Sequence, residues 1–346
     1  MTAGSPDTEP VHEAGSRPRA GSRALDLLVL GEVNPDVVVR AVDPRPAFGQ
    51  VERVVDEIAL TIGSSSVIFA CGAARLGLRV AFVGVVGDDP LGRFMVAAMA
   101  ERGVDAAAVR VDPAIPTGAS VILSAPADRA ILTTLGTMPL LRADDVPAGL
   151  LARARHVHVG SFFLLEALRP DLPALFARVR ARGGTTSLDP NWDPSGEWDR
   201  GLRAVLPLTD VFFPNATEAA RISGRDNPAE AAGALVAAGA RAVAVKLGPD
   251  GGLAADSAGR LERVSALAVE PVDTTGAGDS FDAGFLAGML HGRSLRGCLE
   301  LAVACGSLST LGVGGTAAQP TLAEADAALA RLDLVTHAPR APEVPR

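Results

Sequence analysis

Short apolar runs alternate with Ala-rich helical stretches along most of the chain. Continuous apolar runs of this length, bounded by Gly, Asp or Asn, are typical of buried strands. They predict strands at 25–29, 80–86, 119–123, 130–134 and 241–247, and others just before Gly160, Asp189 and Asn215. The helical pattern predicts helices at 67–76, 94–102 and 281–289. This alternation indicates an α/β protein with a mostly parallel sheet between two layers of helices.

One segment departs from this pattern. Between Val51 and Ile62 the apolar residues follow no helical period, which favours one or two partly exposed strands. We interpret the region around 37–62 as a small antiparallel β-lid inserted into the α/β body. Because no internal repeat and no long central linker are visible, we expect a single domain over 25–332.

The two ends of the chain differ in composition from the centre. Residues 1–24 are rich in Gly, Ser, Pro and charged residues and contain no apolar core of a secretory signal. Residues 333–346 contain repeated Pro. Such composition cannot bury enough apolar surface to fold, so we expect both ends to be flexible tails.

The charge balance and the cysteines exclude several classes of protein. A formal net charge of -8 argues against a protein that coats nucleic acid. No apolar segment is long enough to span a bilayer, so we expect no membrane contact. Cys71, Cys298 and Cys305 form no CxxC pair, which excludes the usual zinc and disulfide patterns and favours buried thiols. We therefore expect a reducing, cytoplasmic location. Lys246 is the only lysine and follows no Gly, so no P-loop is present.

The strongest chemical signal is the sequence DTTGAGDSF at 273–281, which precedes an apolar helix. Gly276, Ala277 and Gly278 have little or no side chain, so consecutive backbone N–H groups can approach a ligand closely. The start of the helix adds unpaired N–H groups and the positive end of its dipole, which favour an anion. Asp279 in the first turn is a poor phosphate ligand but a suitable general base for an attacking hydroxyl. The alternative role for Asp279 is a simple helix N-cap.

Two further places carry candidate polar groups. Asn215 and Glu218 lie three residues apart after an apolar run, so both lie on one face of a helix that begins there. Glu218 can hold Mg²⁺ directly or through water; the alternative is a helix cap with a solvated Glu218. Asp36 follows a strand end and could accept hydrogen bonds from two sugar hydroxyls, or cap a turn after Pro35.

Residues 273–290 closely resemble the C-terminal signature of the ribokinase-like (PfkB-type) carbohydrate kinases. Other motifs of that family occur in the family's order. They are GEVNPD at 31–36, GDDPLG at 87–92, NATE at 215–218 and KLGPDGG at 246–252. The resemblance covers about 25–329. It implies a ribokinase-like three-layer α/β/α sandwich with a small β-lid over the sugar.

The resemblance also implies a reaction and a set of site residues. The reaction is transfer of the ATP γ-phosphoryl group to an alcohol, with Asp279 as the base and the backbone of 276–278 as the anion hole. The acceptor would contact Asp36, Gly63, Ser64, Ile68 and Asp279. The nucleotide would contact Asn215, Lys246, Gly248, Asp250, Gly251, Gly276, Gly278 and Val303. Mg²⁺ would lie near Glu218, and Asp273 and Thr275 match positions that bind a monovalent cation such as K⁺ in many relatives.

The chain departs from the family pattern in its acceptor loop. Where relatives usually have a second Gly and a sugar-binding Asn, this sequence has Ser64 and Ile68. Loss of the amide removes a donor and an acceptor, which predicts an acceptor with an apolar portion unless the serines at 64–66 replace it. Asp193 stands where relatives often have Arg, which argues against an acidic sugar. His156 and His158 share one strand face without a third ligand, so we expect packing.

The leading hypothesis is therefore an ATP-dependent kinase of a sugar or sugar-like alcohol. The alternatives are a nucleoside kinase of the same fold and, from another class, a non-catalytic sugar or nucleotide sensor. Retention of Asp279 beside the Gly-rich turn argues against a sensor, because a binder needs no base. The expected partners are the small-molecule acceptor and ATP, and a second copy of the chain could pair through the lid.

Overall fold

The computed structural model describes residues 25–125 and 129–336, so most of the predicted tails, at 1–24 and 337–346, lie outside the described residues. A nine-stranded sheet forms the centre, in the order β15-β14-β13-β12-β11-β10-β1-β4-β6. Its strands are β1 (Leu25–Leu30), β4 (Val80–Val83), β6 (Val104–Asp105), β10 (Ala154–Val159), β11 (Thr185–Leu188), β12 (Val211–Phe212), β13 (Ala242–Lys246), β14 (Gly252–Asp256) and β15 (Leu261–Val264). Pairing is parallel from β6 to β13 and antiparallel through β14 and β15, which confirms the mostly parallel sheet.

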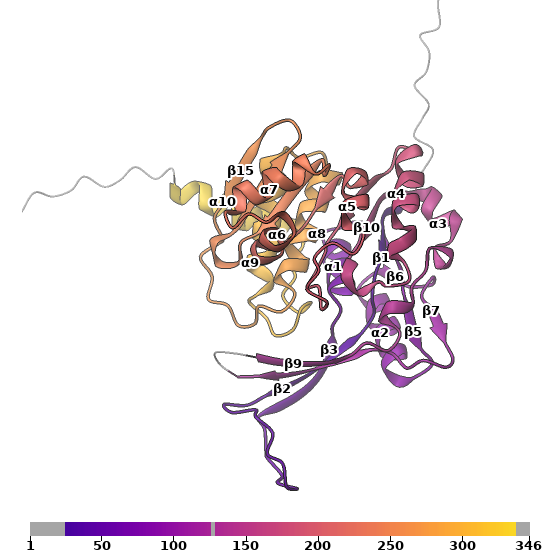
Figure 1. Ribbon diagram of the computed structural model, residues 1–346. Coiled ribbons are helices and arrows are strands. Elements are labelled where there is room, and N and C mark those ends of the chain that lie inside the picture. Colours follow the sequence, from indigo (N-terminus) through magenta and orange to yellow (C-terminus); the bar gives the residue numbers. More distant parts are fainter. Residues whose placement is uncertain (1–24, 126–128, 337–346) are drawn as a thin grey trace, which may run out of the picture.

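Helices cover both faces of this sheet (Figure 1). One layer contains α1 (Ser65–Arg75), α2 (Pro90–Glu101), α8 (Ala277–Leu290), α9 (Leu295–Ser309) and α10 (Leu322–Thr336). The other contains α3 (Ala148–Arg153), α4 (Leu172–Ala181), α5 (Leu202–Val205), α6 (Ala216–Ser223) and α7 (Pro228–Ala237). The apolar residues of β1 divide between the two cores: Leu27 and Val29 face the first layer, and Leu28 and Leu30 face the second. The three-layer α/β/α architecture is as predicted.

The lid is larger than the sequence indicated. It is a four-stranded sheet in the order β3-β2-β8-β9, built from β2 (Pro35–Arg40), β3 (Glu57–Ile62), β8 (Ala119–Ser124) and β9 (Arg129–Thr134). The strands predicted at 119–134 therefore belong to the lid. Residues 51–56 form no strand, so the predicted strand content of that segment is confined to β3. Pairing between segments about 80 residues apart leaves no local signal in the sequence.

Two further element boundaries differ from the prediction. The strand expected at 80–86 is two strands, β4 and β5 (Val85–Gly87), and β5 pairs with β7 (Arg110–Asp112) in a separate small sheet. The break falls at Gly84, where an added Cβ would lie 2.7 Å from Val33 Cγ2 and 2.8 Å from Gly31 O. Helix α10 reaches Thr336, four residues beyond the expected domain boundary at 332. Within the described ranges, no helix has the length and apolar character to cross a membrane.

Candidate active site

The sequence predicts an anion site at the turn where α8 begins. Gly276 is its N-cap residue, with a φ of 72° that favours glycine. The helix can lie deep in the molecule because Gly284 faces α9 closely: a Cβ there would lie 2.8 Å from Leu301 O. The N–H of Ala277 donates to Thr274 O at 3.3 Å, so the turn itself uses one of the predicted amides. The other N–H groups of the first helical turn have no partner within the helix and can serve an anion.

Asp279 lies in this first turn, partly exposed to a cavity. The enclosed position raises the pKa of its carboxyl well above the usual range, and the negative charge of Asp189 raises it further, while Lys246 opposes the shift. A hydrogen bond with Ser65 also favours the ionised form. A raised pKa suits a group that must accept a proton near neutral pH.

The cavity next to Asp279 has a volume of about 770 Å³, enough for a nucleotide-sized ligand. Its lining contains both polar and apolar residues. The polar or charged ones include Ser65, Asp189, Asn191, Asn215, Glu218, Lys246 and Asp279, and the apolar ones include Leu267, Val269, Pro271, Phe281 and Val303. The polar residues come from the carboxyl ends of β11, β12 and β13 and from the starts of α1, α6 and α8, where ligands bind in open α/β sheets.

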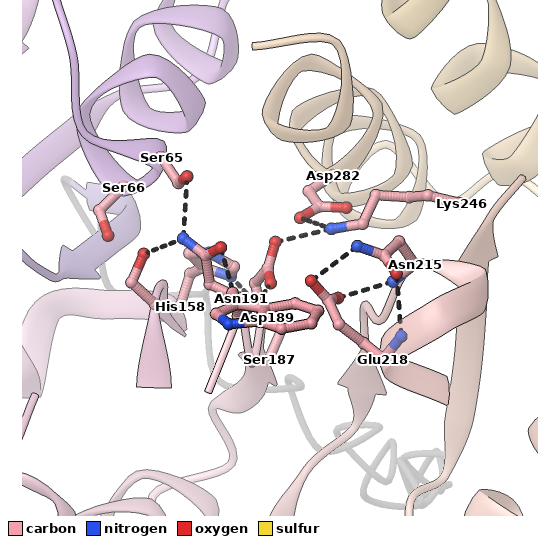
Figure 2. Close-up of polar contacts among 12 residues, drawn as sticks. Ser65, Ser66, His158, Ser187, Asp189, Asn191, Asn215, Glu218, Lys246 and Asp282 are labelled. Carbon is pink, nitrogen blue, oxygen red and sulfur yellow. Dashed lines mark hydrogen bonds and ion pairs between the residues drawn. The ribbon is translucent and has the colours of Figure 1, made fainter. Parts of the chain in front are cut away.

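Lys246 extends from the end of β13 toward the start of α8, between two carboxylates (Figure 2). Its Nζ lies 2.7 Å from Asp189 Oδ2 and 3.2 Å from Asp282 Oδ2. The side chain also passes close to Gly278, where an added Cβ would lie 3.3 Å from Lys246 Cδ. Although burial opposes its charge, the two carboxylates raise the pKa of Lys246, so the ammonium group remains charged beside the anion site.

Asn215 and Glu218 form a capping box at the start of α6. Glu218 Oε2 accepts from the Asn215 backbone N–H at 2.8 Å, and Glu218 Oε1 accepts from its side-chain amide at 2.7 Å. The cap considered from the sequence is therefore present, but Glu218 is buried rather than solvated. Burial, together with the negative charge of Asp189, raises the pKa of Glu218 to about 7.

Asp36 and Gly63 lie in direct contact at the base of the lid. Asp36 is buried on β2, and the Asn34 side-chain amide donates to its Oδ1 at 3.3 Å. A Cβ at Gly63 would lie 2.2 Å from that same Oδ1, so only glycine lets the carboxylate approach this closely. The structure thus brings together Asp36 and Gly63, two of the five residues that were predicted to bind the acceptor.

The three serines at the start of α1 face different partners. Ser64 is the N-cap residue, and its hydroxyl donates to Glu32 O at 2.7 Å and accepts from Val67 N. Ser66 donates to Glu32 Oε2. The side chain that reaches the cavity is instead Ser65, which accepts from Asn191 Nδ2 at 3.2 Å and bonds to Asp279. Of the three serines considered as substitutes for the missing amide, Ser65 is therefore the one placed to act.

The other predicted site residues divide into those at the cavity and those apart from it. Val303, Gly248 and Gly251 line the cavity. Asp250 is exposed in a short turn and is absent from that lining. Ile68 is buried and packs on the Gly-rich turn: a Cβ at Gly276 would lie 2.8 Å from Ile68 Cγ2.

Asp273 and Thr275 hold the turn before α8. Asp273 Oδ1 accepts from Thr275 N at 2.9 Å, and Oδ2 accepts from Gly314 N at 2.9 Å. The Arg40 guanidinium lies 3.5 Å from Asp273 Oδ2. Burial works against ionisation, but these backbone N–H groups and Arg40 hold the pKa of Asp273 below its usual range. The Asp273 carboxylate therefore already has N–H and cationic partners, and this arrangement favours a structural role in the turn over binding of K⁺.

His156 and His158 pack within the sheet, as the sequence indicated. His156 hydrogen bonds to Thr185 Oγ1 and Ser187 Oγ, each at 2.7 Å, and His158 stacks on Phe69 with ring centroids 3.9 Å apart. Burial lowers the pKa of both rings, which are therefore neutral at physiological pH. Among the described residues, no cluster of His, Cys, Asp and Glu could hold a metal ion by itself.

The sequence analysis assigned no role to several residues that line or support this cavity. Asp189 and Asn191 follow β11 in the sequence Asp-Pro-Asn, and Asp282 interrupts an apolar helix three residues after Asp279. A charged residue inside an apolar helix, and polar residues directly after a buried strand, were the available signals. Glu32 gave no such signal, because its partners Ser64 and Ser66 are more than 30 residues away.

Comparison with known proteins agrees with this geometry. Residues 24–322 match the model of the pfkB family of carbohydrate kinases. Over 275 residues, 75% of this chain and 88% of the relative, the chain is 34% identical to a fructokinase from Klebsiella pneumoniae. It is 31% identical to 2-dehydro-3-deoxygluconokinase from Bacillus subtilis, over 73% of this chain and 81% of that one.

The solved structures give the same result. A protein from Escherichia coli described as a ribokinase II, in complex with ATP and Mg²⁺, superposes with a TM-score of 0.78 and 25% identity, over 89% of this chain and 99% of that one. The fold and the site define a phosphotransferase that acts on an alcohol group. The chain belongs to the pfkB family of carbohydrate kinases.

Proposed function

We propose that the protein transfers the γ-phosphoryl group of ATP to a hydroxyl of a neutral sugar or sugar-like alcohol. The observation that carries this proposal is the position of Asp279. Its carboxyl has a raised pKa, lies in the first turn of α8 and lines a nucleotide-sized cavity. A carboxylate in this position repels a resting phosphate but can accept a proton from a hydroxyl that attacks one.

In the proposed mechanism, Asp279 removes the proton from the acceptor hydroxyl while the oxygen of that hydroxyl attacks the γ-phosphorus. The bond to the β–γ bridging oxygen breaks, and ADP leaves with the electron pair. The first-turn N–H groups of α8 and the Lys246 ammonium stabilise the negative charge on the transferring group. Apolar side chains of the cavity lining, such as Val303, contact the adenine, and Asp36 and Ser65 orient the acceptor.

Mg²⁺ would be bound mainly by the nucleotide phosphates, where it neutralises charge on the donor. Glu218 fits this role through water, because both of its oxygens already accept hydrogen bonds from Asn215. A raised pKa makes Glu218 a group that a cation would convert to its ionised form. We assign no step to K⁺, since Arg40 already lies beside Asp273.

Charge in the described part of the site favours a neutral acceptor. Among the residues that the structure describes, Lys246 is the only basic one that lines the cavity, and two carboxylates bind it. Asp193 accepts from Ser195 N and Trp198 N and so serves a local turn rather than the site. The carboxylate of Asp36 would repel an acidic or phosphorylated acceptor.

The test is an ATP-consumption assay of the purified protein against neutral sugars, polyols, nucleosides, sugar acids and sugar phosphates. We expect a neutral compound to give the highest kcat/KM. A sugar acid or sugar phosphate as the best acceptor would contradict the neutral-acceptor assignment. ATP consumption with no member of the panel, in a protein that binds ATP, would contradict the kinase assignment and favour a sensor.

We further propose that two copies of the chain pair through the lid. In Figure 1 the lid extends away from the α/β body. It exposes large apolar side chains on two strands, with Ile58 at 66% and Leu132 at 65%. Exposed apolar surface on a sheet is typical of an interface. Light scattering should give a dimer mass for the wild type and a monomer for the double variant Ile58→Lys/Leu132→Lys. A monomeric wild type would refute the pairing.

A further inference from the structure

Asp282 lies beside the only lysine of the chain but cannot be explained as a simple counter-ion. Its side chain is 1% exposed, and its Oδ2 lies 3.2 Å from Lys246 Nζ. Asp189 makes the shorter contact with the same ammonium, at 2.7 Å. A single positive charge thus faces two buried carboxylates (Figure 2), although it can neutralise only one of them.

The second oxygen of Asp282 gives independent evidence. Oδ1 is buried and receives no hydrogen bond from any donor in the described part of the chain. An ionised carboxylate oxygen without a donor carries a large desolvation cost. A proton on Asp282 removes this cost, because the neutral carboxyl becomes a donor and the neighbouring Asp189 carboxylate is its acceptor.

We propose that Asp282 is a positioning residue which carries a proton, shares it with Asp189 and thereby holds the charged Lys246 against Gly278 at the anion site. The effect of this role on catalysis rests on the proposed kinase function, whereas the protonation of Asp282 does not depend on that function. With Asp282 neutral, the positive charge of Lys246 is matched by the single negative charge of Asp189. The ammonium group can then stabilise negative charge on a ligand that binds at the start of α8.

The titratable groups around Asp282 agree with this assignment. Lys246 of β13, Asp189 at the end of β11 and Asp279 on α8 face it. Burial raises the pKa of Asp282 well above its usual range and Lys246 lowers it, whereas Asp189 and Asp279 raise it further. Burial also works against ionisation of Asp189, but Lys246 and the hydrogen bond from Asp282 hold its pKa below the usual range. His158 of β10 faces Asp189 and Lys246 as a neutral ring.

Asp282→Asn tests the proton directly, because asparagine has the same shape as a protonated aspartate and cannot ionise. A group with a raised folded-state pKa stabilises the fold below its unfolded pKa and loses that contribution as pH rises. Asp282→Asn should therefore melt at least ~3 °C higher than wild type at about pH 8, with a smaller difference at about pH 4.5. The matched variant Asp189→Asn should behave oppositely: it melts lower than wild type, and its deficit shrinks on acidification.

The proposal would be overturned if Asp282→Asn had a lower melting temperature than wild type at about pH 8 and the difference became smaller on acidification. Failure of this variant to fold would also overturn it. A second readout uses wild-type protein: its infrared spectrum near neutral pH should contain a carboxylic-acid C=O band that Asp282→Asn lacks. If the two infrared spectra did not differ in this band, the proposal would also be overturned.

Turnover separates positioning from general stability. Asp282→Ala should lower kcat at least ~10-fold, because Lys246 is held at one side only, and Asp282→Asn should restore it to within ~3-fold of wild type. Equal losses in both variants would contradict positioning by a neutral carboxyl. If no acceptor is phosphorylated while the melting series gives the expected signs, the kinase proposal fails and the assignment of the proton stands.

Discussion

Gly63→Ala probes the acceptor site through a single methyl group. The added Cβ would lie 2.2 Å from Asp36 Oδ1, 2.5 Å from Asp36 Cγ and 2.9 Å from Asn34 Nδ2. Ordinary contact begins at 3.4 Å, so the carboxylate must move by about 1.2 Å, the difference between 3.4 and 2.2 Å. Asp36 is buried on a strand and bonded to Asn34, so the movement takes its carboxylate away from the position in which we propose that it binds the acceptor.

The expected cost follows from the hydrogen bonds that Asp36 would make. A hydrogen bond to a charged group contributes about 1.5–3 kcal/mol, so loss of one from an acceptor hydroxyl lowers kcat/KM for the acceptor by roughly 10- to 100-fold. KM for ATP should change by less than ~2-fold, because Gly63 does not line the cavity in which we propose that the nucleotide binds. Steady-state kinetics with each substrate varied in turn measure the two effects.

Gly233→Ala is the matched control. Gly233 lies within α7, and a Cβ there meets nothing within 4 Å. Its kinetics should equal those of wild type, with the fold stabilised by up to ~1 kcal/mol from helix propensity. Unchanged acceptor kinetics in a folded Gly63→Ala variant would refute the role of Asp36 in acceptor binding. An equal loss for ATP and acceptor would instead indicate general damage.

Three further predictions concern single groups. Glu218→Gln should raise the Mg²⁺ concentration needed for half-maximal rate at fixed ATP, while KM for the acceptor stays within ~2-fold; an unchanged Mg²⁺ titration would leave Glu218 as a helix cap only. Ile68→Asn should weaken the natural acceptor and improve plain ribose or fructose in a side-by-side assay, and wild type that uses those two best would contradict this. Because its raised pKa keeps Asp279 protonated at low pH, kcat should rise with pH through that pKa; a flat rate over about pH 5–8 would contradict the base role.

The sequence predicted the parts of the site that are local in the chain. The Gly276–Asp279 turn and the Asn215–Glu218 cap each need only one helix start, so spacing and residue type were sufficient. Six of the nine strands of the central sheet were likewise visible as apolar runs, whereas β6, β14 and β15 were not predicted. The assignment of Asp36 and Gly63 as acceptor-binding residues came from a family resemblance, and the structure adds that the two lie in close contact, which only a glycine permits.

The parts that escaped prediction depend on contacts across long stretches of sequence. Lys246 meets Asp189 and Asp282 over separations of 57 and 36 residues. The use of Ser64 and Ser66 by Glu32, which leaves Ser65 for the cavity, likewise required the tertiary structure. Periodicity carries no information on which polar side chains converge once the strands are ordered in the sheet.

Single-turnover phosphoryl transfer by Asp279→Asn tests the central claim most directly. The variant keeps the size of the side chain at the start of α8 but cannot accept the hydroxyl proton. With the best acceptor of the panel, we expect the rate to fall at least ~10²-fold while the affinity for ATP, measured by calorimetry, stays within ~3-fold of wild type. A folded Asp279→Asn variant with near-wild-type single-turnover rate would contradict the assignment of Asp279 as the general base.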